Sequence, residues 1–149
     1  MRVAVQEAPF DFGAEAEAFA RGAGGAGAVV TFTGVVREAD SGAMACMEIE
    51  HYPGMTQKAL EQIATEAMSR WDLTDALVIH RYGRLAPGAQ IMMVATAARH
   101  RVAAFDAAEY LMDYLKSRAP FWKKEILQDG SADWVAAKDA DEDALRRWQ

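Results

Sequence analysis

The sequence predicts an α+β fold with a split βαβ core and a mainly antiparallel sheet. Between residues 44 and 127, two segments with helical spacing of apolar residues alternate with segments typical of strands. The resulting order is strand, helix, strand, strand, helix, strand. A strand and a helix precede this core, and a hairpin and a helix follow it. Since the chain shows no internal boundary, we expect one domain over residues 1–149.

The part before the core is predicted to form a strand, a helix and a second strand. Residues 3–5 have the alternation of a short strand, and residues 11–21 form a helix with Asp11 as a possible N-cap. The glycine-rich run 22–27 ends this helix. We interpret the run as a connector, because it lacks the Gly-Lys-Ser/Thr ending of a phosphate-binding loop and a strand at 28–36 follows it.

The core alternates strands with two amphipathic helices. Residues 55–71 place apolar side chains at helical spacing, and Thr56 is a possible cap of that helix. Residues 100–118 repeat the spacing with an apolar face of their own. The four core strands are expected at residues 44–52, 75–82, 90–97 and 121–127.

Turn signals separate these elements. The Ala-Pro-Gly sequence at residues 86–88 joins the two middle strands, and Pro120 ends the second helix because its ring disfavours helical geometry in the preceding residue. Asp129-Gly130 is a strong hairpin signal and pairs the last core strand with residues 132–135. Residues 139–148 are predicted to form a polar terminal helix.

Composition excludes several classes of function. Apolar residues make up 52% of the chain and charged residues 26%, as in a soluble globular protein, and no apolar run approaches the length needed to cross a bilayer. A net charge of -6 argues against non-specific nucleic-acid binding. The single cysteine, Cys46, allows no internal disulfide and fits a reducing compartment, so we expect a cytoplasmic protein with no nucleic-acid or membrane partner.

A local basic cluster stands out against this acidic background. Lys116, Arg118, Lys123 and Lys124 surround Pro120. Because a helix should end before the proline and a strand begin after it, Lys116 and Lys123 are predicted to converge on one pocket. The alternative is that cations here merely stabilise the helix C-terminus through its partial negative charge.

The two lysines are candidates for acid–base chemistry. Like-charge proximity and desolvation lower the pKa of a lysine, which allows general acid or base catalysis. Glu125 should share the face of Lys123 and could orient it, whereas Lys124 should point to the opposite face of a regular strand.

Other polar residues give weaker indications. Arg37 closes a strand and could bind a phosphate in a bidentate manner, although an exposed structural arginine is the alternative. His100 and Arg101 begin a helix, where backbone N–H groups favour anions, although an ordinary exposed pair is equally consistent. His51 and His80 are interpreted as isolated histidines near strand ends. No metal-ligand spacing is evident, so we assign no metal and no cofactor.

Five segments in order resemble the large, catalytic subunit of molybdopterin synthase. They are distributed over most of the chain, from about residue 27 to residue 135. They are Val-Thr-Phe-Thr-Gly-Val-Val-Arg at 30–37, Ile-Glu-His-Tyr-Pro-Gly-Met at 49–55, Ile-His-Arg-Tyr-Gly at 79–83, His-Arg at 100–101, and Met-Asp-Tyr-Leu-Lys-Ser-Arg-Ala-Pro-Phe-Trp-Lys-Lys-Glu at 112–125.

The resemblance implies a sulfurtransferase of molybdenum cofactor biosynthesis. Such an enzyme converts cyclic pyranopterin monophosphate into molybdopterin by installing two sulfurs as a dithiolene. It implies a small ubiquitin-like sulfur-carrier subunit as partner, whose C-terminal Gly-Gly carries a thiocarboxylate. It also implies a central homodimer of catalytic subunits within a heterotetramer.

The resemblance also implies roles for particular residues. Lys116 and Lys123 match catalytic lysines, and His100 and Arg101 match an anion-binding pair that reaches the neighbouring subunit's site. The implied substrate-binding residues are Val35, Val36, Arg37, His100, Arg101, Lys116, Lys123, Lys124 and Glu125. Possible further pocket residues are Phe32, Met112 and Lys138.

Two other classes of function remain open from the residues alone. One is a non-catalytic α+β dimer that binds an anionic metabolite or a partner's tail. The other is an enzyme that forms a Schiff base between a carbonyl substrate and Lys116 or Lys123.

Overall fold

Two four-stranded sheets and four helices make up the described part of the chain. The computed structural model describes residues 1–38, 43–136 and 139–149. In chain order the elements are β1 (Arg2–Gln6), α1 (Phe12–Gly22), β2 (Ala28–Val35), β3 (Met44–His51), α2 (Met55–Arg70), β4 (Asp75–Arg81), β5 (Gly83–Leu85), β6 (Gln90–Ala98), α3 (Arg101–Ser117), β7 (Phe121–Leu127), β8 (Ala132–Trp134) and α4 (Asp139–Arg146).

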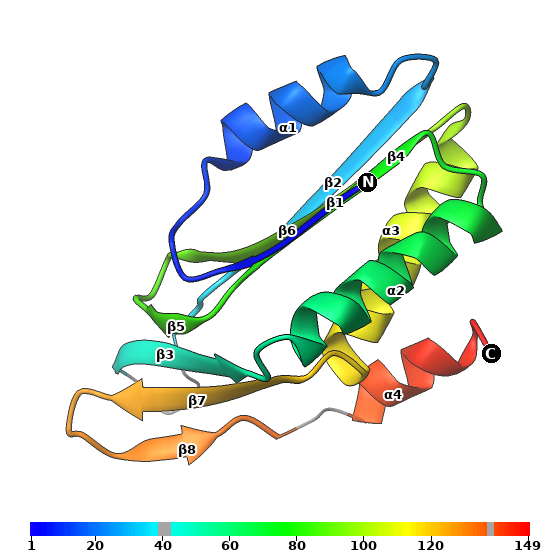
Figure 1. Cartoon of the computed structure of the whole chain (residues 1–149). Helices are drawn as coiled ribbons and strands as arrows, with labels where there is room; N and C mark the ends of the chain where they lie inside the picture. Colours follow the sequence, from blue (N-terminus) through cyan, green and yellow to red (C-terminus); the bar gives the residue numbers. More distant parts are fainter. Residues whose placement is uncertain (39–42, 137–138) are drawn as a thin grey trace.

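The first sheet has the order β1-β4-β6-β2 and lies between helices. Only its β1–β4 pair is parallel. Figure 1 shows α1 on one face of this sheet and α2 and α3 on the other. Its central strands, β4 and β6, are buried almost throughout, as expected for strands covered on both faces. The larger hydrophobic core lies on the α2 and α3 side, and a smaller one lies under α1.

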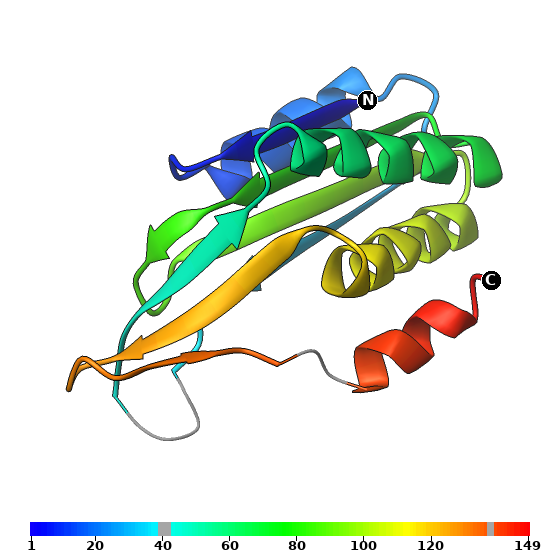
Figure 2. The same ribbon diagram turned by 60° about the horizontal axis from the view of Figure 1, so that its bottom comes forward.

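The second sheet has the order β5-β3-β7-β8 and is wholly antiparallel. Its strands β3, β7 and β8 run side by side next to the end of α3 (Figure 2). This sheet therefore carries β7, the strand with Lys123, to the C-terminal end of the helix that carries Lys116.

The α+β class is confirmed, but the four core strands do not share one sheet. β4 and β6 belong to the first sheet, whereas β3 and β7 pair with each other in the second. The switch occurs at Gly83, where a φ of +88° turns the chain from β4 into β5, a strand that the sequence analysis did not predict. A Cβ at this position would also approach Glu7 Cγ at 3.2 Å, so both the backbone conformation and the limited space favour glycine.

The predicted N-cap was confirmed for α1 and wrong for α2. Asp11 caps α1 by accepting a hydrogen bond from the backbone N–H of Ala14 at 3.0 Å. The expected cap of α2 was wrong: Gly54 is the N-cap, and Thr56 lies inside the helix with its hydroxyl buried. The Thr56 hydroxyl instead donates to the carbonyl of Tyr52 at 2.9 Å, and so ties the helix to the preceding loop.

The C-terminal helix packs against α3 through a polar and aromatic cluster. The indole N–H of Trp148 donates to Asp113 at 2.6 Å, and Arg147 pairs with the same carboxylate at 2.8 Å. The Arg70 guanidinium lies 5.5 Å from the centre of the Trp148 ring. These contacts hold the end of the chain beside α2 and α3 (Figure 2).

Candidate functional site

One end of the first sheet collects most of the residues singled out from the sequence. In the β2–β6 ladder, Ala28 at the start of β2 lies opposite Ala98 at the end of β6. Because α3 begins soon after β6 ends, β2 and α3 both start at this end of the sheet and both lead to the opposite end. Arg37, just beyond β2, and Lys116, in the last turn of α3, are therefore carried to the same end. His80 lies at this end too, because it pairs with Met92 near the start of β6.

The turn between α3 and β7 is tightly specified by backbone hydrogen bonds. The N–H groups of Arg118 and Ala119 both donate to the carbonyl of Tyr114, at 2.7 and 3.1 Å. The N–H of Phe121 then donates to the carbonyl of Ala119 at 2.8 Å, across Pro120. The helix ends where the proline predicts, and β7 starts immediately afterwards.

The register of β7 separates its charged residues onto two faces. Phe121, Lys123 and Glu125 lie opposite His51, Ile49 and Met47 of β3 and share their face of the sheet. Ile49 is fully buried there, so this face points inward. Lys124 lies on the other face, with its ammonium 4.9 Å from the centre of the Trp134 ring.

Two histidines, interpreted from the sequence as isolated, lie at the centre of this end of the sheet. The His80 ring stacks on Phe121, with centroids 3.7 Å apart and planes inclined by 16°. The His51 ring lies 4.3 Å from Tyr82 and 6.3 Å from Phe121. The interpretation of the two as isolated was wrong, because the pairing of β3 with β7 brings His51 beside Phe121. A signal was present, since both histidines fall within segments that resemble the synthase family.

His80 is held as a neutral ring. Only 4% of the residue is exposed, and its Nδ1 lies 2.8 Å from the carbonyl of Arg81. Because a carbonyl only accepts hydrogen bonds, Nδ1 carries the proton and donates. Burial is the main cause that lowers the pKa of His80, to about 3, against the opposing effect of the Arg81 carbonyl.

The charges of the two lysines reach the same buried ring. After burial, Lys123, Lys116 and His51 each contribute to lowering the pKa of His80. Both lysines therefore act electrostatically on His80, and their convergence on one pocket stays a prediction. We call Lys116, Lys123, His80 and Phe121 together the lysine site.

The segment that ends in Arg37 is shaped by an irregularity in the sheet. The register of β2 against β6 shifts between Gly34 and Val35, a feature common near functional sites. Val36 is buried, its N–H donates to Ala89 and its carbonyl accepts from Gly88. Val36 therefore anchors the chain, while Val35 and Arg37 are exposed beside it.

His100 and Arg101 lie far from the lysine site of their own subunit. His100 is the N-cap residue of α3, Arg101 is the first residue of the helix, and Lys116 is in its last turn. At the rise of an α-helix, about 22 Å of axis separates Arg101 from Lys116. The two ends of α3 therefore cannot serve one small-molecule site within a single subunit.

The predicted apolar pocket residues lie along the same side of the fold. Phe32 is 43% exposed on β2, and Met112 is half-buried on α3, one turn before Lys116. Lys138 lies outside the described residues.

Among the described residues, no group of three or more His, Cys, Asp or Glu side chains could hold a metal ion. Within the same residues, no helix has the length and hydropathy of a membrane span.

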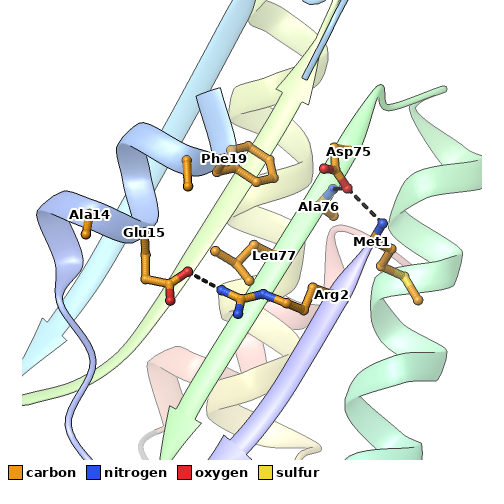
Figure 3. A pocket seen from close by; sticks show the side chains of 9 residues that line it. Met1, Arg2, Ala14, Glu15, Phe19, Asp75, Ala76 and Leu77 are labelled. Carbon is orange, nitrogen blue, oxygen red and sulfur yellow. Dashed lines mark hydrogen bonds and ion pairs between the residues drawn. The ribbon is translucent and has the colours of Figure 1, made fainter. Parts of the chain in front are cut away.

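A hollow lies elsewhere, between α1 and the β1–β4 pair. It has a volume of about 620 Å³ and contains none of the residues predicted to form the site. Arg2 and Glu15 form an ion pair across it, and the Met1 amine pairs with Asp75 at 2.8 Å (Figure 3). Because these charged groups already satisfy one another, we do not consider this hollow the active site.

Comparison with known proteins gives one consistent result. The family model described as MoaE protein matches residues 5–118. A molybdopterin synthase catalytic subunit from Cereibacter sphaeroides is 70% identical over 148 residues, which cover 99% of this chain and 100% of the relative. The crystal structure of molybdopterin synthase from Staphylococcus aureus superposes with a TM-score of 0.79 at 31% identity, over 89% of this chain and 96% of the other.

A further structure extends this likeness. The molybdopterin biosynthesis MoaE protein from Burkholderia ambifaria is 51% identical, covers 98% of this chain and 96% of its own, and superposes with a TM-score of 0.80.

Proposed function

The chain belongs to the MoaE protein family and has the function of a molybdopterin synthase catalytic subunit, a sulfurtransferase of molybdenum cofactor biosynthesis; from this premise we propose that the transfer takes place at the lysine site. The observation that supports the proposal is that Lys116, in the last turn of α3, and Lys123, near the start of β7, lie on either side of a tight hydrogen-bonded turn. We propose that the whole chain acts as one domain, and that it works in the cytoplasm.

We propose that a small second subunit is the partner of this chain and that it delivers the sulfur. The sulfur would arrive as a thiocarboxylate on the C-terminal Gly-Gly of a ubiquitin-like protein. Two ammonium groups at one site favour an anionic tail electrostatically. Cys46 is a poor carrier by comparison, because it lies within β3 between Ala45 and Met47, which supply no positive charge locally.

The acceptor in this proposal is cyclic pyranopterin monophosphate. Arg37 lies at the same end of the fold as Lys116 and is exposed, so its guanidinium can bind a phosphate. Fixing the phosphate would hold the pterin side-chain carbons next to the incoming sulfur. Val35 and Glu125 flank this region, and we retain both as substrate contacts.

The lysines supply charge stabilisation and proton transfer. As the thiocarboxylate sulfur bonds to a pterin side-chain carbon, a carbon–oxygen bond of that carbon breaks, and Lys116 and Lys123 stabilise the negative charge on the departing oxygen or donate a proton to it. The product of this step is joined to the partner's terminal glycine through a thioester. Water then hydrolyses the thioester, which leaves sulfur on the pterin and a carboxylate on the partner. Glu125, on the face of Lys123, is placed to orient these groups.

We propose that a second copy of the chain completes the site. His100 and Arg101 lie too far from Lys116 to act in their own subunit, but they could bind the substrate's phosphate in a neighbour. An exposed apolar surface runs from the edge strand β2 to the start of α3, and it is suited to a homodimer. Its large side chains are Phe32 (43% exposed), Val35 (50%), Val102 (64%) and Phe105 (57%).

A reconstitution assay tests this function. Purified chain, the thiocarboxylated small subunit and cyclic pyranopterin monophosphate are combined, and dithiolene-containing molybdopterin is measured. Product that requires all three components supports the synthase. Binding of the small subunit without any product would favour the alternative, a non-catalytic dimer. Borohydride trapping of a carbonyl substrate on a lysine would favour a Schiff-base enzyme.

A further inference from the structure

His80 is the one buried titratable side chain at the lysine site for which the proposed chemistry has no use. It comes from the end of β4, in the first sheet, whereas the lysines come from α3 and β7. Its exposed fraction is 4%, so the residue is almost entirely enclosed. Burying an imidazole in a charged neighbourhood is costly unless the ring has a defined partner.

The ring of His80 has two such partners, and together they fix its orientation. Its Nδ1–H donates to the carbonyl of Arg81 at 2.8 Å, which sets the tautomer and the tilt of the ring. One face then lies flat on Phe121, with centroids 3.7 Å apart. A stack inclined by only 16° leaves the Phe121 ring little freedom to tilt.

Phe121 lies between the two lysines in the chain and is connected to the structural elements of both. It is the first residue of β7 and shares the inward face with Lys123, two residues later. On its other side it is tied by a backbone hydrogen bond to Ala119, and so to the end of the helix that carries Lys116. The position of Phe121 is therefore linked both to the strand of one lysine and to the end of the helix that carries the other.

We propose that His80 is a positioning residue for sulfur transfer, whose neutral ring holds Phe121 and thereby sets the placement of Lys123 relative to Lys116. This inference rests on the proposed function, since the positioned groups are its two lysines. His80 touches Phe121 and not the reacting atoms, so it acts through the lysines. A neutral His80 ring is also favourable at the lysine site, because a charged ring would be a third cation and would repel the two lysines.

Two substitutions separate the contributions of the ring. His80→Asn keeps an N–H donor for the Arg81 carbonyl but removes the aromatic plane. His80→Phe keeps a neutral aromatic plane on Phe121 but removes the donor. Thr96→Val is the matched control: Thr96 is fully buried and donates to the Ala104 carbonyl at 2.7 Å, and it lies opposite Ala76, near the other end of β4.

The experiment measures kcat and KM for pterin conversion with the thiocarboxylated small subunit in excess. We expect His80→Asn to lower kcat by about tenfold or more, with KM for the pterin changed by less than about threefold. We expect His80→Phe to restore most of the lost rate. Thr96→Val should lower the melting temperature while leaving kcat as in the wild type.

The possible outcomes are distinguishable. Wild-type kcat in His80→Asn would overturn the inference and leave the proposed function standing. Equal loss in the Asn and Phe variants would also overturn it, because the ring stack would then not be the element that positions the lysines. A kcat that falls in all three variants in proportion to their loss of stability would show a structural role only. Absence of product with the wild-type protein would instead refute the proposed function.

Discussion

His80 and Phe121 stack face to face although they come from different sheets and are distant in the sequence. His80 ends β4 of the first sheet, and Phe121 begins β7 of the second. Their contact joins the two sheets at the point where α3 ends, and His51 of β3 lies against the same Phe121 ring. The placement of both proposed catalytic lysines thus depends on how the two sheets meet.

Acid should destabilise the protein through His80. The pKa of His80 is lowered from 6.5 to about 3 in the folded state, mainly by burial. Below pH 6 the unfolded chain therefore binds a proton at His80 that the folded chain does not, and stability falls as pH falls. The expected contribution is a loss of about 1.4 kcal/mol per pH unit between roughly pH 6 and 4.

Urea unfolding at several pH values measures this contribution. The free energy of unfolding is compared between the wild type and His80→Phe from pH 7 to pH 4.5. The other titratable groups are present in both proteins and largely cancel in the difference. The wild type should lose stability more steeply than the variant. Parallel curves would mean that His80 is protonated in the folded state as readily as in the unfolded chain.

Adjacent lysines on β7 should differ sharply in their effect on activity. Lys123 shares the inward face with Glu125, whereas Lys124 lies on the outer face over Trp134. We expect Lys123→Ala to lower the rate of molybdopterin formation by about 10²-fold or more, and Lys124→Ala to lower it by less than about threefold. A comparable loss in both variants would contradict the assignment of faces, and would restore Lys124 to the substrate-binding set implied by the family resemblance.

A charge on the apolar surface of α3 should disrupt both assembly and activity. Phe105 is 57% exposed in the single subunit, so Phe105→Asp should cost the fold little. If this surface forms the homodimer, the variant should sediment as a monomer. It should also lose turnover, because Arg101 of a neighbour would no longer reach the lysine site. Ala20→Asp, on the exposed side of α1, is the control. A monomeric variant with full activity would show that each subunit is complete by itself.

Local structure was predictable because its causes are local. The period of apolar residues located α2 and α3, Asp11 located the start of α1, and Pro120 located the end of α3. The same proline separates the end of α3 from the start of β7 by only a few residues, and the predicted convergence of Lys116 and Lys123 rests on that separation.

The division into two sheets could not be predicted in the same way. It depends on which strands pair, and the apolar pattern within a strand does not identify its partners. Gly83, whose positive φ diverts the chain, was one glycine among 11 and carried no distinctive signal. The ring cluster around Phe121 is a consequence of that division. For this reason His51 and His80 were interpreted as isolated.

The central claim is that sulfur transfer depends on Lys116, and a single-turnover experiment tests it most directly. Lys116 is exposed at the end of α3, so Lys116→Ala should leave the melting temperature unchanged. Lys58→Ala, an exposed lysine on α2 outside the site, is the matched control. We expect molybdopterin formation to fall by about 10²-fold or more in the first variant and to remain at the wild-type rate in the second. Wild-type turnover by Lys116→Ala would contradict the account.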